Sequence, residues 1–184
     1  MSTPAIRSCD GDASTKQENK FYHNRMVTMG DTGQDVSDEE LCSLFPGAVD
    51  RDSAAHYRGR LRRQLMINRC ADCGTWHAPP KPVCPSCLSD RVEARPVSGA
   101  GTIFMAVFLH QGPPAEGVDY STPYPVVTVD LDEQTGLRFS STVVGSPNEE
   151  IQIGRRVELD WITRGGAPMP VFRLAEQESQ EGAA

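Results

Sequence analysis

The chain has 184 residues, of which 38% are hydrophobic and 7% aromatic, and its net charge is −7 at neutral pH. No apolar run approaches the ~20 residues of a membrane-spanning helix, so the composition predicts a soluble chain of one or two small domains. The first residues lack the basic region and apolar run of a signal peptide, which makes the cytoplasm the expected location.

Residues 1–50 are predicted to be a mostly disordered N-terminal extension, because they are polar and rich in Asp, Gly, Ser and Thr. Ser37 precedes three acidic residues, a pattern typical of a helix N-terminus, and we expect a short helix over 38–45 that ends before Pro46. Met26 and Met29 are candidate start positions. If translation begins at either of them, the residues upstream are an artefact.

Residues 51–68 are predicted to form a docking helix and a lead-in strand. From Asp52 onward, apolar residues recur three and four positions apart, as on one face of a helix; they are Ala54, Tyr57, Leu61 and Leu65. Four arginines surround this stripe, namely Arg58, Arg60, Arg62 and Arg63. A helix this short is marginal alone in water, so its stripe needs the next domain or a partner to cover it.

Two Cys-x-x-Cys knuckles, ten residues apart, predict a rubredoxin-like zinc ribbon at 69–95. The four ligands are Cys70, Cys73, Cys84 and Cys87. Two intervening residues let each knuckle chelate through both sulfurs, and four thiolates at about 2.3 Å close a tetrahedral zinc site. Such a closed site is structural. Gly74 suits the left-handed backbone after the first knuckle, and Pro85 stiffens the second.

Other readings of the four cysteines fit less well. A rubredoxin-like iron site is expected to need a longer segment between its knuckles, and disulfides need an oxidising compartment. His77 lies between the knuckles, but four thiolates already saturate zinc, so we expect this histidine at the surface or against an aromatic ring. One structural zinc is therefore the predicted cofactor.

Residues 96–175 predict a five-stranded OB-fold barrel, followed by a disordered tail at 176–184. Apolar runs bounded by turn residues indicate strands at 102–110, 125–131, 137–144, 156–162 and 170–174. Gly99 and Gly101 permit the bend that a small closed sheet requires. The long 112–125 connection is a candidate binding or docking loop, or else surface slack. The fold class is thus mainly β, with an N-terminal helix, a zinc ribbon and a barrel.

The order of these motifs resembles a known family. Arg69-Cys70-Ala71-Asp72-Cys73-Gly74 follows a helix, Pro79-Pro80-Lys81 precedes Cys84-Pro85-Ser86-Cys87, and Ser98-Gly99-x-Gly101-Thr102 opens the barrel. Pro123-Tyr124-Pro125 and Ile153-Gly154-x-x-Val157 complete the pattern. Residues 52–175 are similar to the zinc-ribbon plus OB-fold proteins of domain-of-unknown-function family 35. One departure is that Ala94 follows Glu93 where the family commonly has an aromatic residue.

The resemblance implies a non-catalytic subunit of a thiolase-like enzyme, such as a thiolase, an acyltransferase or a steroid side-chain aldolase. The enzyme subunit performs carbon–carbon chemistry on an acyl-CoA thioester, and the small subunit supports it, in a heterotetramer of two plus two. Four basic residues are candidates for contact with CoA phosphates or with an acidic patch of the partner, because guanidinium groups bind phosphate well; they are Arg58, Arg62, Arg63 and Lys81.

Two alternatives remain open from the residues alone: a single-stranded nucleic-acid-binding protein and a stand-alone acyl-CoA-binding module. Lys and Arg minus Asp and Glu give −5 for residues 1–50, +5 for 51–95 and −7 for 96–184. A groove that follows phosphates needs positive potential, which the acidic barrel segment lacks, so nucleic acid is the less favoured partner.

Overall fold

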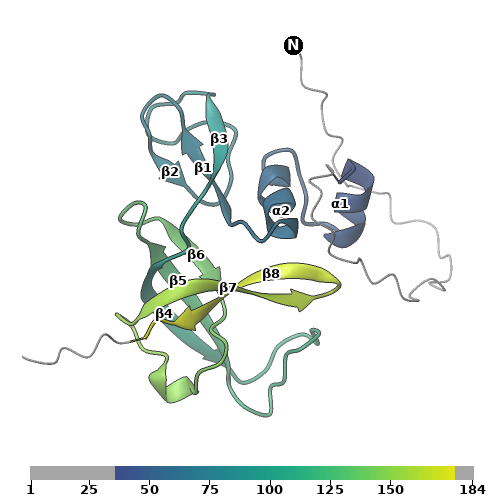
Figure 1. Cartoon of the computed structure of the whole chain (residues 1–184), viewed down its shortest axis with the longest axis vertical. Helices are drawn as coiled ribbons and strands as arrows, with labels where there is room; N and C mark the ends of the chain where they lie inside the picture. The colour runs from purple at the N-terminus through teal and green to yellow at the C-terminus, as the bar shows by residue number, and fades with distance from the viewer. Residues whose placement is uncertain (1–35, 177–184) are drawn as a thin grey trace, which may run out of the picture.

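The computed structural model describes residues 36–176, which form two short helices, a three-stranded sheet and a five-stranded barrel (Figure 1). Of the segments predicted to be mostly disordered, 1–50 and 176–184, residues 1–35 and 177–184 lie outside the described residues, whereas 36–50 contain a helix and buried side chains. The mainly β fold class predicted from the sequence is confirmed. None of the helices in the described part has the length and apolar character needed to cross a membrane.

The two helices pack together at the N-terminal side of the described chain. Helix α1 (Asp38–Leu44) begins with a capping box, in which Ser37 Oγ accepts from the Glu40 amide at 3.2 Å. Such a cap satisfies amides that the first helical turn leaves unpaired. Helix α2 (Ala54–Leu61) follows. A small buried cluster joins both helices to the start of the last strand, and it consists of Leu41, Phe45, Val49, Ala54 and Ala167.

The ribbon sheet has the order β2-β1-β3, with all pairs antiparallel. Its strands are β1 (Met66–Cys70), β2 (Trp76–His77) and β3 (Val92–Pro96). Because β1 ends at Cys70 and β2 begins just after Cys73, the β1–β2 turn is the first metal knuckle. The three strands are short, and the sheet buries few apolar side chains.

The barrel sheet has the order β6-β5-β4-β7-β8. Its strands are β4 (Gly101–Leu109), β5 (Tyr124–Leu131), β6 (Arg138–Ser141), β7 (Arg156–Arg164) and β8 (Ala167–Leu174), with a 3-10 turn at Asn148–Glu150. A parallel bridge between Val143 and Phe172 brings the two ends of the sheet together, which nearly closes the barrel. This strand order and closure are those of an OB-fold.

The start of β4 shows why the sequence places glycines there. A Cβ atom on Gly101 would lie 2.5 Å from the Asp130 carbonyl oxygen, and one on Gly99 would lie 2.3 Å from Leu159 Cβ. Gly99 also has a φ of +77°, a left-handed conformation that favours glycine. The close approach of β4 to β5 therefore depends on the missing side chain at Gly101.

Ribbon and barrel share one core. Leu65 and Ile67 are buried together with the barrel residues Ile103, Val129 and Phe172. The side chain of Gln134, in the β5–β6 turn, also pairs with the outer backbone edge of β2: its Oε1 accepts from Trp76 N at 2.9 Å and its Nε2 donates to Trp76 O at 3.0 Å. Gln134 thus makes the two hydrogen bonds that a neighbouring strand would make to β2, and it fixes the ribbon against the barrel.

Replacing Gln134 with Ala is expected to weaken the contact between the ribbon and the barrel. The change leaves a part-buried amide and carbonyl of Trp76 without partners, at a cost of about 1–3 kcal/mol. Urea unfolding and Trp76 fluorescence, in a Trp161→Phe background, measure the effect. Gln152→Ala is the matched control, because the exposed side chain of Gln152 donates to the nearby Glu149 carbonyl. Equal unfolding midpoints for the two variants would contradict the assigned role of Gln134.

Candidate functional site

The four predicted ligands come together at one end of the ribbon. Their sulfur atoms all lie within 4.8 Å of one another, and two of the separations, Cys70–Cys87 and Cys73–Cys84, are 3.6 Å. Tetrahedral zinc with 2.3 Å bonds places its sulfurs about 3.8 Å apart. The donor set and its spacing therefore fit one zinc ion, held by Cys70, Cys73, Cys84 and Cys87.

The two knuckles repeat the same backbone pattern. Cys70 N donates to Thr75 O and Gly74 N to Cys70 O, and the second knuckle repeats this with Cys84, Ser89 and Leu88. The fourth residue after the start of each knuckle has a positive φ, +75° at Gly74 and +61° at Leu88. Sequence reasoning found Gly74, but it missed Leu88, because no glycine marks the second left-handed position.

The surroundings of Cys73 favour the thiolate that zinc requires. The Thr75 hydroxyl, 3.3 Å from Cys73 Sγ, and the Thr75 amide lower the pKa of the Cys73 thiol to about 6. A hydrogen bond to the charged form stabilises it. At Cys87 the Ser89 amide acts in the same direction, but the three neighbouring thiols outweigh it and raise the pKa to about 12. Four sulfurs complete the coordination of the ion and leave no open position for a water or a substrate, so the centre is structural.

His77 is not part of the metal centre. It lies on β2, opposite Asn68, with 7% of its surface exposed, and neither ring nitrogen has a hydrogen-bond partner among the described residues. Burial lowers the pKa of its imidazole, which favours the neutral ring. Of the two positions expected for His77, the surface is wrong, because the side chain is buried, and no aromatic ring contact to it is found among the described residues.

The basic residues proposed for phosphate or partner contacts lie on α2, just after it, and on the ribbon. Arg58 makes an ion pair with Asp38 across α1 and α2. Arg62 and Arg63 lie exposed just after α2, and Lys81 is exposed on the ribbon. Arg63 also faces β7, where it helps lower the pKa of Asp160, after the Trp161 amide and Arg173.

Arg60 has a structural role that sequence reasoning did not assign. Its guanidinium lies over the rings of Phe45, at 4.6 Å, and Tyr57, at 5.3 Å, and its Nε donates to Pro168 O at 3.0 Å. These contacts join α2 to α1 and to β8. The spacing of Tyr57 and Arg60, one helical turn apart, was the available signal, but Phe45 and Pro168 are distant in sequence.

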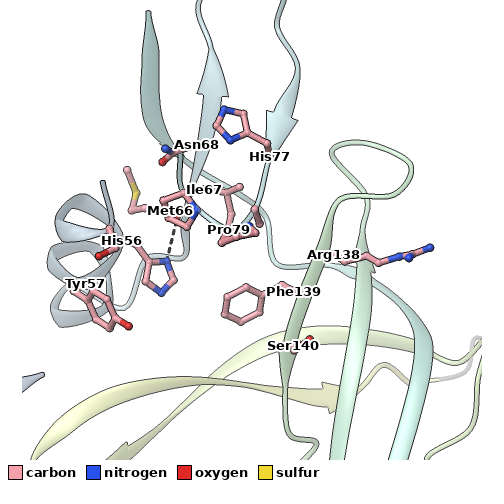
Figure 2. Close-up of a pocket in the computed structure, with 13 residues that line it drawn as sticks. His56, Tyr57, Met66, Ile67, Asn68, His77, Pro79, Arg138, Phe139 and Ser140 are labelled. Carbon is pink, nitrogen blue, oxygen red and sulfur yellow. Dashed lines mark hydrogen bonds between the residues drawn. The ribbon is translucent and has the colours of Figure 1, made fainter. Parts of the chain in front are cut away.

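A cavity of about 270 Å³ lies where α2, the ribbon and β6 meet. Figure 2 shows His56 and Tyr57 on one side of it and Phe139 on the other, with Pro79 and Ile67 between them. The His56 and Phe139 rings are 6.1 Å apart. His56 Nδ1 lies 3.0 Å from the Met66 carbonyl, which only accepts, so Nδ1 carries the proton and donates. The cavity therefore lies at the contact between α2, the ribbon and β6.

Acid is expected to weaken the packing of α2 against the ribbon and β6 around this cavity. Burial lowers the pKa of His56, more than the Met66 hydrogen bond raises it, so the unfolded chain binds a proton more readily than the folded one. Stability is therefore expected to fall as the pH drops below the ordinary histidine pKa of 6.5. Urea unfolding of the zinc-saturated protein between pH 7.5 and 5.5 measures the slope.

Variants separate His56 from other acid-sensitive groups. His56→Asn keeps a donor for Met66 O but does not titrate, so it is expected to reduce the slope on the acid side of the profile. The slope that remains is expected from His77, whose pKa is also lowered by burial. His110→Asn changes an exposed histidine at the end of β4 and serves as the matched control. A His56→Asn profile with the wild-type slope would rule out His56 as the cause.

A four-thiolate zinc ribbon joined to an OB-fold barrel through a shared core defines the class of this protein. Two family models match the chain in that order. One is described as the ChsH2 rubredoxin-like zinc ribbon domain and matches residues 58–93, and the other as the ChsH2 C-terminal OB-fold domain and matches residues 94–161.

Two curated relatives are named for the DUF35 domain. A DUF35 domain-containing scaffold protein of Pyrococcus furiosus is 32% identical over 104 residues, which cover 56% of this chain and 71% of the relative. A scaffold protein of the same name from Methanocaldococcus jannaschii is 27% identical over 72% of this chain and 85% of its own length. The chain belongs to the DUF35 family of zinc-ribbon and OB-fold proteins.

Two further similarities involve enzymes. A protein of Thermomonospora curvata named "Probable enoyl-CoA hydratase alpha subunit" is 37% identical over 138 residues, and this chain spans only 40% of its length. A solved structure titled "Ltp2-ChsH2(DUF35) aldolase" has a chain that is 35% identical, with a TM-score of 0.62; the match covers 69% of this chain and 97% of that one.

Proposed function

We propose that this chain is a non-catalytic subunit of a thiolase-like enzyme and supports carbon–carbon bond cleavage or formation on an acyl-CoA thioester. The observation that carries the proposal is the similarity to a chain of the Ltp2–ChsH2 aldolase, which this chain matches over 97% of that chain's length. The family's scaffold-protein relatives support a role in assembly rather than in chemistry.

The metal centre supports the same role. Four cysteine ligands complete the coordination of zinc, so the ion neither polarises a substrate nor activates water. In the proposed complex the thiolase-like subunit supplies the reacting groups, and this chain holds the assembly in shape. The similarity to a subunit named for an enoyl-CoA enzyme supports a CoA thioester as the substrate class.

The exposed cations are proposed to bind the charged part of that substrate or the partner. Arg62, Arg63 and Lys81 are solvent-exposed and remain candidates for contact with CoA phosphates or an acidic patch. Arg58 is also a candidate, although it has to exchange its Asp38 partner for the new one. A heterotetramer of two plus two is the proposed stoichiometry.

Affinity purification of the tagged chain from its native source tests this function. The proposal expects a thiolase-like protein in equimolar amount, about one zinc per chain, and acyl-CoA carbon–carbon activity only in the presence of both subunits. Recovery of the chain alone, or with nucleic acid, would sink the proposal. Calorimetry with CoA on the chain alone then tests the stand-alone CoA-binding alternative, and salt-dependent binding of single-stranded oligonucleotides tests the other.

A further inference from the structure

The outward face of β4 carries an exposed apolar strip. Met105, Val107 and Leu109 alternate along the strand and are 44%, 42% and 36% exposed, and Phe104, at the β-bulge before them, is 44% exposed. Soluble proteins scatter single apolar residues on their surface, but a contiguous group usually marks an interaction site. This strip holds four of the seven large apolar side chains that are exposed in the described part of the chain.

The same segment of β4 has an open edge. β4 pairs with β5 from Gly101 to Leu109, whereas within the described residues it pairs with β7 only at Gly101 and Thr102. The Ile103 amide and carbonyl still bond on the β7 side, to Arg155 O and Gly154 N. Beyond the bulge, alternation along an antiparallel strand turns the backbone groups of Ala106 and Phe108 to this open side.

Beyond Phe104, whose ring has the Arg138 guanidinium over it at 3.5 Å, this edge lacks the usual protection. Natural proteins guard an edge strand with charged residues or prolines, because its unpaired amides and carbonyls recruit other strands. Residues 103–109 contain neither charge nor proline, and the β5 residues opposite the strip, Tyr124, Val126 and Thr128, are uncharged as well. The surface therefore suits an extended, uncharged segment of another chain, which gains backbone hydrogen bonds at the edge and apolar contacts on the face.

We propose that β4 is the docking strand for the thiolase-like subunit: an extended, uncharged segment of that subunit pairs with β4 at Ala106 and Phe108 and covers Met105, Val107 and Leu109. This inference rests on the proposed function, which supplies an enzyme subunit as the occupant. It adds the surface, the chemistry of the partner segment and the direction from which the enzyme approaches the barrel.

The test uses the complex of this chain with the thiolase-like subunit identified by the purification above. Val107→Lys and Leu109→Lys place a charge on the strip without touching the barrel core, and each is expected to weaken binding at least about tenfold in surface plasmon resonance. Leu88→Lys is the matched control, because Leu88 is 78% exposed on the second knuckle; it is expected to change affinity less than about twofold.

Hydrogen exchange provides a readout that does not depend on a variant. In the complex, the amides of Ala106 and Phe108 are expected to become protected, since they gain partners, while the amide of Leu88 keeps its exchange rate.

Wild-type affinity of both lysine variants, together with unchanged exchange at Ala106 and Phe108, overturns the docking strand but leaves the proposed function intact. If the chain alone is a dimer that Val107→Lys dissociates, the occupant is a second copy and the proposal is wrong. If no thiolase-like protein binds, both proposals fail.

Discussion

Zinc removal is expected to unfold the ribbon at residues 66–96 while the barrel keeps its fold. Few apolar side chains are buried in the ribbon, and two of its most buried residues, Cys70 and Cys84, are metal ligands. Zinc binding contributes about 10–16 kcal/mol in small modules, as much as or more than the 5–15 kcal/mol net stability of a typical domain. The metal therefore decides whether the ribbon is folded.

Cys73→Ser tests the same dependence without a chelator. Loss of one thiolate is expected to release the zinc and to remove the dispersed amide resonances of β1, β2 and β3 from a nitrogen–proton NMR spectrum. Resonances of β4 to β8 persist, although Leu65 and Ile67 leave the shared core. Ser86→Ala, an exposed change inside the second knuckle, is the control and retains one zinc by mass spectrometry. A Cys73→Ser ribbon that stays folded without zinc contradicts the prediction.

Phe172→Ala is expected to give the largest loss of stability among single changes in the barrel. Phe172 has no exposed surface, packs edge-on against Phe139 at a centroid distance of 6.3 Å, and lies on the strand that closes the barrel. Truncating a buried Phe to Ala costs about 3–5 kcal/mol, because apolar contacts are lost and a cavity remains. The midpoint of urea unfolding, followed by far-ultraviolet circular dichroism with zinc in excess, measures this loss.

Phe104→Ala is the matched control for that measurement. It removes the same atoms from the barrel's outer face, where Phe104 is 44% exposed and its ring centroid lies 3.5 Å from the Arg138 guanidinium. Its cost is expected to stay below about 1 kcal/mol. Similar losses for the two variants would mean that Phe172 is not the centre of the core.

The edge of β4 proposed to bind the partner also affects the solubility of the isolated chain. An unprotected apolar edge is an aggregation hazard for a chain on its own, and β4 keeps one. The inference that a partner covers the edge predicts that Val107→Lys raises the solubility of the isolated chain. A solubility limit equal to that of the wild type, measured by turbidity at increasing concentration, goes against it.

Local chemistry made much of the fold and the metal centre predictable. Zinc ligation depends on residue type and on spacing within a few positions, so Cys70, Cys73, Cys84 and Cys87 identified the site directly. Ser37 marked the start of α1, and alternating apolar residues located all five barrel strands. Strand ends were less well predicted: the 137–144 strand is ladder-paired only as Arg138–Ser141, because the chain then leaves β5 to meet β8.

Contacts between distant positions needed the tertiary structure. Gln134 bonds to Trp76 across 58 positions and Arg60 to Pro168 across 108, and no local pattern pairs such residues. The open edge of β4 also appeared only when its partners were known, since a strand's own residues do not say which neighbours it lacks.

The sequence alone thus determined the ligands, the elements and their order, because these depend on interactions between near neighbours in the chain. The tertiary structure decided which surfaces are covered and which stay open, because burial and pairing depend on where folding brings distant segments together.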